Sequence, residues 1–389
     1  MRDLHNAPQP VRLGVIGTGL AVEQLHWPAL KRMPERFAIA AFANRSRPKA
    51  ERFAGYTGAS MADYYADYHD LLRRDDVEAV LISLPIPLNY RVTSDCLAAG
   101  KDVICEKPPG VDEEEGRAFL ALETAFPERK VLIAENCFYR DDLRLARSLL
   151  DADAIGRVHL MTWRMVNQIV PIAGRFSSTP WRHHPAYRGG AHLDGGVHHT
   201  AQMRMLCGEV REVHGATQSA NRTVDAPSDL TLNLLFIGGA IGNYTACYPD
   251  IPVPPEPNEM RLYGTDGVMT LGGQASNRHV AIHRPDGSVE EHRFAGIDGG
   301  YFGEFLNFSE ALVHDVPVVA TIGQSFHDML IVLRGLDSAE QGRVVAFDDL
   351  SGSLAPSAVP LWRPRGATGL FDGLPGRQTT ENRSAARPG

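Results

Sequence analysis

The sequence predicts an α/β Rossmann domain, a doubly wound parallel sheet, followed by an α+β domain with a large, mostly antiparallel open-faced sheet. Three observations predict it. Apolar runs alternate with amphipathic runs up to about residue 140, a Gly-x-Gly turn closes the first apolar run, and strand-like runs dominate the second half. We therefore expect a dinucleotide-binding domain at 1–140, a substrate-binding and oligomerisation domain at 141–363, and a flexible tail at 364–389.

Each expected strand of the first domain is a short apolar run, and an amphipathic run follows the first four. The strands are expected at 11–16, 38–43, 80–84, 103–105 and 131–134, and the helices at 21–33, 48–53, 90–99 and 113–124. This β-α-β rhythm is typical of a parallel sheet covered by helices.

The second domain shows a different rhythm, in which strands follow one another without intervening helices. Strands are expected at 158–166, 210–218, 230–236, 242–247, 260–263, 268–271 and 280–283, and helices at 143–150, 196–206, 302–314 and 325–341. Because the helices suffice for one face of such a sheet, we expect the other face to join a second copy in a homodimer or homotetramer.

Composition excludes several classes of function. The 389 residues carry a formal net charge of −8, with no basic run, which argues against a nucleic-acid partner. No segment is long and apolar enough for a membrane partner, and the five scattered cysteines form no Cys-x-x-Cys pair. These features predict a cytoplasmic protein with reduced thiols.

The first candidate site is the turn after the first strand. Gly17 allows a tight turn, and Gly19 allows a pyrophosphate to approach the backbone where Leu20 and Ala21 open a helix. Val22 stands where a third glycine is usual, and an ordinary strand-to-helix turn is the alternative. The β-α-β context favours nucleotide binding.

The residues at the end of the second strand indicate whether NAD(H) or NADP(H) is preferred. An NAD-binding domain usually carries an acid there for the ribose hydroxyls, but this chain has Asn44, Arg45 and Ser46. Asn44 can bind the ribose, and Arg45 and Ser46 can bind a 2′-phosphate. We therefore expect NADP(H) to be favoured over NAD(H), with solvent-facing arginines as the alternative interpretation.

A lysine follows the strand at 103–105, where open α/β sheets place ligands and reactive groups. The sequence there reads Glu106-Lys107-Pro108, and the proline restricts Lys107 to extended geometry. We interpret Lys107 as a candidate catalytic residue, with a Glu-Lys surface turn as the alternative.

A second polar constellation lies at the start of the helix expected at 196–206. Asp194 and His198 have i, i+4 spacing, which places two side chains on one helix face, so Asp194 is expected to orient the His198 ring. The alternatives are a helix N-cap and a buried histidine. The density of histidines also suggests a metal site, built from His183, His184, His192, His198 and His199 with Asp194. Only Asp194 and His198 have shared-face spacing and no cysteine joins them, so we expect no metal.

These motifs together resemble one family. The combination of Gly17-x-Gly19 with His26-Trp-Pro-Ala-Leu30, Glu106-Lys107-Pro108 and Leu193-Asp-Gly-Gly-Val-His198-His199 resembles the glucose-fructose oxidoreductase, inositol dehydrogenase and rhizopine-catabolism (Gfo/Idh/MocA) family. The likeness runs from about Val11 to Asp348 and so covers both domains.

The resemblance implies an NAD(P)-dependent oxidoreductase acting on CH–OH groups of sugars, sugar derivatives or cyclitols. By position, Lys107 would be the catalytic lysine, Asp194 its supporting acid and His198 the proton-transfer residue. Further cofactor contacts implied by the same motifs are Pro85, Asn89, Glu106 and Lys107. The chain departs from the family pattern between Pro85 and Asn89, and at Ala201, where an acid is common.

The candidate substrate contacts come from the end of the fifth strand, the loop before Asp194 and the helix start. They are Asn136, Tyr139, Trp181, Arg182, Tyr187 and His199. Aromatic rings suit a sugar face and an arginine suits an acidic substituent, although core packing is the alternative for each aromatic. Alternative functions are a redox-assisted glycosidase or epimerase-like enzyme, a sugar–sugar oxidoreductase with retained cofactor, and a non-catalytic nucleotide sensor.

Overall fold

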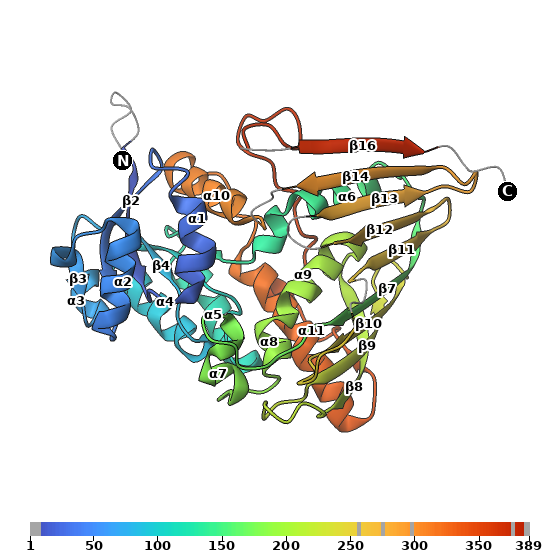
Figure 1. Cartoon of the computed structure of the whole chain (residues 1–389), viewed down its shortest axis with the longest axis horizontal. Helices are drawn as coiled ribbons and strands as arrows, with labels where there is room; N and C mark the ends of the chain where they lie inside the picture. Colours follow the sequence, from blue (N-terminus) through green and yellow to red (C-terminus); the bar gives the residue numbers. More distant parts are fainter. Residues whose placement is uncertain (1–8, 255–257, 274–276, 296–298, 375–377, 385–389) are drawn as a thin grey trace. The chain divides into compact units, whose positions relative to one another are not determined.

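The computed structural model of the chain describes residues 9–254, 258–273, 277–295, 299–374 and 378–384 (Figure 1). They form two compact units. The first contains the described residues up to 134 together with 301–322, and the second contains the described residues of 135–300 and of 323 onward.

The first unit is built on a parallel sheet, as the apolar runs predict. Its strand order is β3-β2-β1-β4-β5-β6, every described pairing is parallel, and the strands are β1 Val11–Ile16, β2 Phe37–Ala43, β3 Tyr64–Tyr65, β4 Ala79–Ile82, β5 Asp102–Cys105 and β6 Val131–Ile133. The two-residue β3 is too short to give a periodic signal and is not among the expected strands. The order reverses between β1 and β4, which is where doubly wound sheets bind ligands.

Three of the helices between these strands begin at a side-chain cap. Asp112 caps the longest of them, because its carboxylate accepts the backbone N–H of Glu115. The helices are η1 Val22–His26, α1 Trp27–Leu30, α2 Arg47–Thr57, η2 Met61–Asp63, α3 Tyr68–Leu72, η3 Ile86–Leu88, α4 Asn89–Ala98 and α5 Glu113–Ala125.

The helix expected at 21–33 is not a regular α-helix. A π-helical turn occupies Val22–His26, and an α-helical turn follows at Trp27–Leu30. Periodicity does not reveal such a turn, because one extra residue per turn still leaves an amphipathic pattern. π turns of this kind are common at functional sites.

Helix α10, Tyr301–His314, belongs to the first unit, whereas the sequence analysis grouped it with the second domain. Its Phe305 and Phe308 rings lie 5.8 and 6.5 Å from the ring of Phe37 on β2. The chain therefore returns to the first unit after completing most of the second.

The second unit is built on a ten-stranded sheet that is antiparallel except for the pair β7 and β10. The order is β15-β8-β9-β10-β7-β11-β12-β13-β14-β16. The strands are β7 Val158–Val166, β8 Val210–Gln218, β9 Asp229–Phe236, β10 Ile241–Cys247, β11 Met260–Gly264, β12 Val268–Gly272, β13 Arg278–His283, β14 Val289–Ala295, β15 Val345–Ala346 and β16 Gln378–Ser384. The expected large, mostly antiparallel sheet is confirmed.

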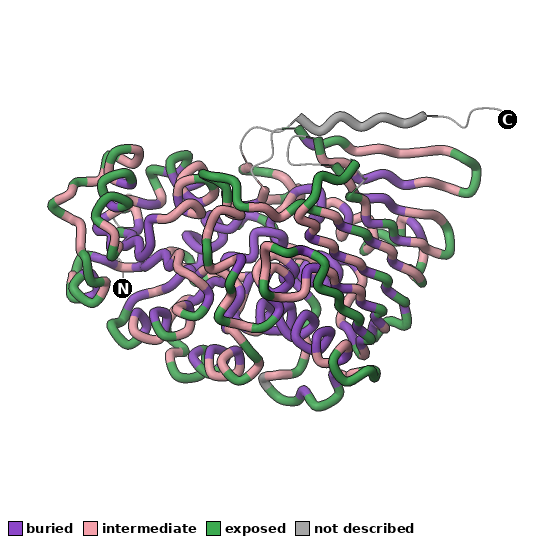
Figure 2. Tube along the Cα trace, turned by 60° about the horizontal axis from the view of Figure 1, so that its bottom comes forward, coloured by how far each residue is buried: buried purple, intermediate pink, exposed green. Residues whose placement is uncertain are grey.

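Helices α9 and α11 lie against one face of this sheet (Figure 1). The helices of the second unit are η4 Asn136–Tyr139, α6 Asp141–Asp151, η5 Phe176–Ser178, α7 Pro180–His183, α8 Ala191–Asp194, α9 Gly196–Cys207, α11 Ile322–Gln341 and η6 Gly352–Leu354. Buried residues alternate along β9 and β10, and the turns between strands are exposed (Figure 2). Asn233 and Asn243 hydrogen-bond across the uncovered face of the sheet.

The flexible tail expected at 364–389 needs correction. Residues 378–384 form β16, which pairs antiparallel with β14 along its length. Before it, Arg144 donates to the carbonyl oxygens of Trp362 and Leu370, and Phe371 lies 6.3 Å from Phe294. Composition does not predict this strand, because a segment can pair with the edge of a sheet through backbone hydrogen bonds alone, without apolar side chains.

One further expectation concerns membranes. Within the described ranges, every helix is too short or too polar to span a bilayer.

Candidate active site

The turn after β1 contains two glycines that differ in what the fold requires of them. Gly17 has a φ of +89°, and a Cβ there would lie 2.1 Å from the carbonyl oxygen of Ser83. A Cβ on Gly19 would meet nothing within 4 Å. The fold therefore requires glycine at 17, whereas at 19 the space beside the backbone is open to a ligand.

The end of β2 presents Asn44, expected to contact the ribose, and Arg45 and Ser46, expected to contact a 2′-phosphate. Asn44 donates to the hydroxyl of Thr18 at 2.9 Å and accepts from the backbone N–H of Ser46 at 2.8 Å. These bonds tie the end of β2 to the glycine turn. Arg45 is exposed and Ser46 is half-buried at the start of α2.

Lys107 is half-buried in the segment that follows β5, also in the first unit. The neighbouring Glu106 accepts from the ring of His26, with Nε2 and Oε1 2.7 Å apart. Asn89, expected as a cofactor contact, is fully buried and donates to the carbonyl oxygens of Glu106 and Pro108. Asn89 and Glu106, both expected as cofactor contacts, thus form the hydrogen bonds that hold the segment around Lys107.

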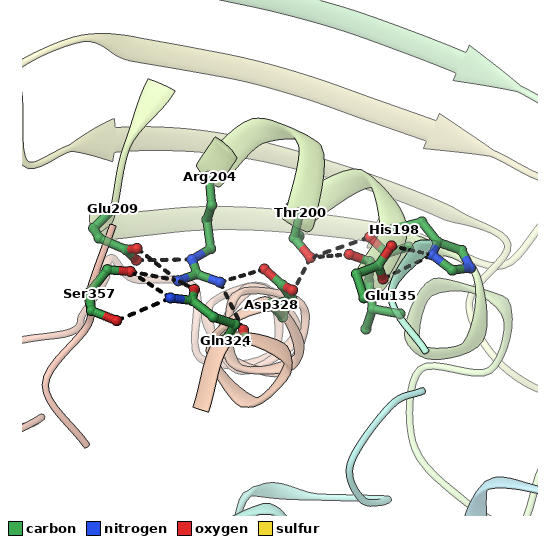
Figure 3. Close-up of polar contacts among 10 residues, drawn as sticks. Glu135, His198, Thr200, Arg204, Glu209, Gln324, Asp328 and Ser357 are labelled. Carbon is green, nitrogen blue, oxygen red and sulfur yellow. Dashed lines mark hydrogen bonds and ion pairs between the residues drawn. The ribbon is translucent and has the colours of Figure 1, made fainter. Parts of the chain in front are cut away.

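His198 lies in the first turn of α9 in the second unit, and its partner is Glu135. The Nδ1 atom lies 2.8 and 2.9 Å from the two carboxylate oxygens of Glu135 (Figure 3). Burial raises the pKa of Glu135, but the charge and hydrogen bond of His198 outweigh burial and leave that pKa below its ordinary value. An ionised Glu135 makes Nδ1 the donor, which leaves Nε2 to accept a proton.

Asp194 lies on α8, and Gly195 separates this short helix from α9. Its carboxylate accepts from Nε of Arg182 at 2.6 Å. The Arg182 guanidinium also stacks 4.0 Å from the ring centre of Trp181 and donates to Thr179. These hydrogen bonds thus pair Asp194 with Arg182 and His198 with Glu135, and the expectation that Asp194 orients His198 stays a prediction.

The remaining candidate substrate residues have different environments. Tyr139 is 1% exposed and packs against Trp362, and Asn136 is 8% exposed and donates to the carbonyl oxygen of Gly299. Burial raises the pKa of Tyr187, whose ring lies 6.5 Å from that of Trp181. His199 hydrogen-bonds to the hydroxyl of Tyr244. Tyr139 belongs to the core, and Trp181, Tyr187 and Arg182 form an aromatic and charged cluster.

Comparison with known proteins shows to which family the chain belongs. The oxidoreductase-family model with an NAD-binding Rossmann fold matches residues 11–131, and the GFO/IDH/MocA C-terminal domain matches residues 143–270. The chain belongs to the GFO/IDH/MocA family of oxidoreductases.

Three members of this family illustrate the likeness. A dTDP-3,4-didehydro-2,6-dideoxy-α-D-glucose 3-reductase from Streptomyces violaceoruber is 32% identical over 284 residues, 67% of this chain and 76% of that one. An inositol 2-dehydrogenase from Pseudomonas savastanoi is 32% identical over 146 residues, 38% of this chain and 43% of that one. An oxidoreductase from Thermotoga maritima has a crystal structure similar to this one, with a TM-score of 0.78, 29% identity, and coverage of 87% of this chain and 98% of that one.

The position of His198 depends on the helix that carries it, α9. Two turns further along α9, Arg204 pairs with Asp328 at 2.6 Å and Glu209 at 2.7 Å (Figure 3). Thr200 donates to the carbonyl oxygen of Asp328 at 2.8 Å, so α9 is bonded to α11 at two levels. Removing one partner of such a buried pair costs about 3–5 kcal/mol, because the other charge is left buried and unpaired.

A metal at His198 is the alternative use of the same groups. One ligand atom each from Glu135, Cys137 and His198 lies within 4.8 Å of the others. Burial raises the pKa of the Cys137 thiol well above its ordinary value, and the Arg140 guanidinium lies 4.0 Å from its sulfur. A protonated thiol beside a fixed positive charge opposes a cation, so the geometry favours the hydrogen-bonded pair in this family member.

Proposed function

We propose that this chain catalyses reversible hydride transfer between NAD(P) and a secondary alcohol or ketone of a sugar, sugar derivative or cyclitol. The observation that carries the proposal is the Glu135–His198 pair. Nδ1 of His198 is hydrogen-bonded to the Glu135 carboxylate, which leaves Nε2 of the same ring to exchange a proton with the substrate. Family membership supports the nicotinamide cofactor. The named relatives, a sugar 3-reductase and an inositol 2-dehydrogenase, support the substrate class.

The residues of the first unit fit a dinucleotide. The space beside Gly19 and the start of the helix after it suit a pyrophosphate, and Asn44 suits a ribose. A bound nicotinamide supplies the carbon that accepts or donates the hydride. The chain's own residues then bind and orient the substrate and exchange its hydroxyl proton.

We assign His198 as the residue that takes the hydroxyl proton in oxidation and returns it in reduction. Glu135 holds the ring and stabilises the imidazolium that forms, because an ionised, buried carboxylate lies against Nδ1. We assign Lys107 to the substrate oxygen, where an ammonium stabilises developing alkoxide charge. Asp194 acts through Arg182, whose guanidinium it holds beside Trp181 as a support for the sugar.

We infer a preference for NADP(H). No acid follows β2, and Arg45 is exposed beside Ser46 at the start of a helix. A guanidinium and a helix start both suit a 2′-phosphate, whereas a carboxylate there would repel it.

We also infer that the uncovered face of the ten-stranded sheet joins a second copy. Ile241, at the start of β10, is 57% exposed, and Ile237, in the turn before that strand, is 60% exposed. Light scattering on the purified protein would give the mass of a dimer or tetramer, and a monomer at all concentrations would refute this.

A substrate panel tests the proposed function. Sugars, aminosugars, inositols and their oxo forms are each incubated with NAD(P)+ or NAD(P)H, and the nicotinamide absorbance is followed. We expect stoichiometric change with one class, faster with NADP(H) than with NAD(H). Substrate turnover without net change in absorbance would favour a redox-assisted glycosidase or a sugar–sugar enzyme, and dinucleotide binding without any turnover would favour a sensor.

A further inference from the structure

A buried amide side chain binds the segment that carries Lys107 on both sides of the lysine. Asn89, at the start of α4, is fully buried, and its Nδ2 lies 2.8 Å from the carbonyl oxygen of Glu106 and 3.2 Å from that of Pro108. Glu106 and Pro108 flank Lys107. An amide nitrogen has two protons, so one side chain can bind the backbone on both sides of the lysine.

A second buried side chain holds the same segment from the helix after β1. His26 ends the π-helical turn and is fully buried, and its Nε2 lies 2.7 Å from Oε1 of Glu106. The ring packs edge-on against Tyr301 and Phe305 of α10, at 6.0 and 5.6 Å between centres. The Glu106 side chain is 15% exposed, so its hydrogen bond to His26 is shielded from water.

The unpartnered atoms define how these side chains bond. Nδ1 of His26 is buried without a hydrogen-bond partner, so the ring bonds through Nε2, and the carboxylate of Glu106 is the acceptor. His26 therefore donates to Glu106. Oδ1 of Asn89 is likewise buried without a partner, so this amide binds through its donors.

From this geometry we propose that Asn89 and His26 are positioning residues for Lys107, and that Asn89 does not contact the cofactor. They hold the backbone before and after the lysine and the side chain of the preceding glutamate. This inference rests on the proposed function, in which Lys107 binds the substrate oxygen. Misplacing a reacting group by about 1 Å can cost about 100-fold in rate, so such support is a catalytic requirement.

The test uses three variants of the full-length protein. Asn89→Ala removes both donors, His26→Phe keeps the ring packing but removes the bond, and His26→Gln restores a donor. His69→Gln is the matched control, because His69 is exposed on α3 and bonds to Asp67. The readouts are kcat on the best substrate of the panel, NADP(H) affinity by tryptophan quenching, and circular dichroism. Lys107→Met serves as the reference for complete loss of activity.

We expect kcat to fall at least about tenfold in Asn89→Ala and His26→Phe, with cofactor affinity within about threefold of wild type. His26→Gln should recover most of the rate. A loss of cofactor affinity in Asn89→Ala with kcat unchanged would identify Asn89 as a cofactor contact and overturn the proposal, as would wild-type rates and affinities in both variants.

A second measurement needs no substrate. The rate at which an acylating reagent modifies Lys107 is followed by mass spectrometry, with Lys49 on α2 as the internal reference. We expect this rate to change at least about threefold relative to Lys49 in both loss variants and not in His69→Gln. If the wild type turns over no member of the panel, the proposed function fails. The labelling still decides the positioning, and an unchanged Lys107 rate overturns it.

Discussion

At the scale of single residues, the two glycines of the first turn have different reasons to be glycine. Gly17 adopts a left-handed conformation against the backbone of Ser83, so the fold excludes any other residue. Gly19 has an ordinary φ and open space around it. Because nothing in the protein itself demands glycine at 19, its role is best explained by the approach of a ligand.

This difference leads to a prediction for Gly19→Ala. We expect its free energy of unfolding to stay within about 0.5 kcal/mol of wild type, while the dissociation constant for NADP(H) rises at least about tenfold. Urea unfolding and fluorescence titration measure the two quantities. Gly55→Ala, at an open position on α2, is the control and should leave affinity unchanged. Unchanged affinity in Gly19→Ala would argue against a pyrophosphate at this turn.

The partner of His198 is the residue that sequence reasoning missed. Spacing along one helix pointed to Asp194, but Gly195 interrupts that helix and Asp194 lies against Arg182. Glu135 lies 63 positions before His198, and only the folded chain brings the two together. One signal was present, because Glu135 lies two residues after the apolar strand β6, at the carboxyl end of a parallel sheet.

At the scale of elements, the packing of α11 on the large sheet depends on a pair of glycines. A Cβ on Gly215 of β8 would lie 2.1 Å from the carbonyl oxygen of Gly335 on α11, and a Cβ on Gly335 would lie 2.5 Å from Leu232. The helix therefore approaches the sheet more closely than other residues would allow. Helix α11 also carries Asp328, so this contact supports α9 and His198.

We expect Gly215→Ala to lower the free energy of unfolding by about 1–3 kcal/mol, because the added methyl group must displace backbone. Gly238→Ala is the matched control, since a Cβ there meets nothing within 4 Å. Urea denaturation of both variants measures the difference. Equal stability of the two variants would contradict this account of the packing.

Most elements could be predicted from the sequence where periodicity is strong. The runs that became β1, β7 and β8 have the expected bounds, because alternating or continuous apolar residues mark them. The short β3 and β15, the edge strand β16 and its neighbour β14 are not among the expected strands. Their pairing depends on backbone hydrogen bonds to a neighbouring strand, which side-chain patterns do not reveal.

At the scale of the whole molecule, the chain builds two units that are not successive in sequence. Helix α10 returns to the first unit because its phenylalanines pack on β2, although the sequence order placed it in the second. An amphipathic helix can cover any apolar surface, so composition alone could not assign it. The predicted fold class was nevertheless right, because both sheet types follow from local patterns.

The central claim is that the chain transfers a hydride between nicotinamide and a sugar carbon while His198 exchanges the proton. The most direct measurement uses NADPH fully deuterated at C4 with the keto sugar that the panel identifies, and mass spectrometry of the product. We expect deuterium on the new carbinol carbon, and no transfer in His198→Ala. Turnover that leaves the product unlabelled, or labelled transfer at the wild-type rate in His198→Ala, would contradict it.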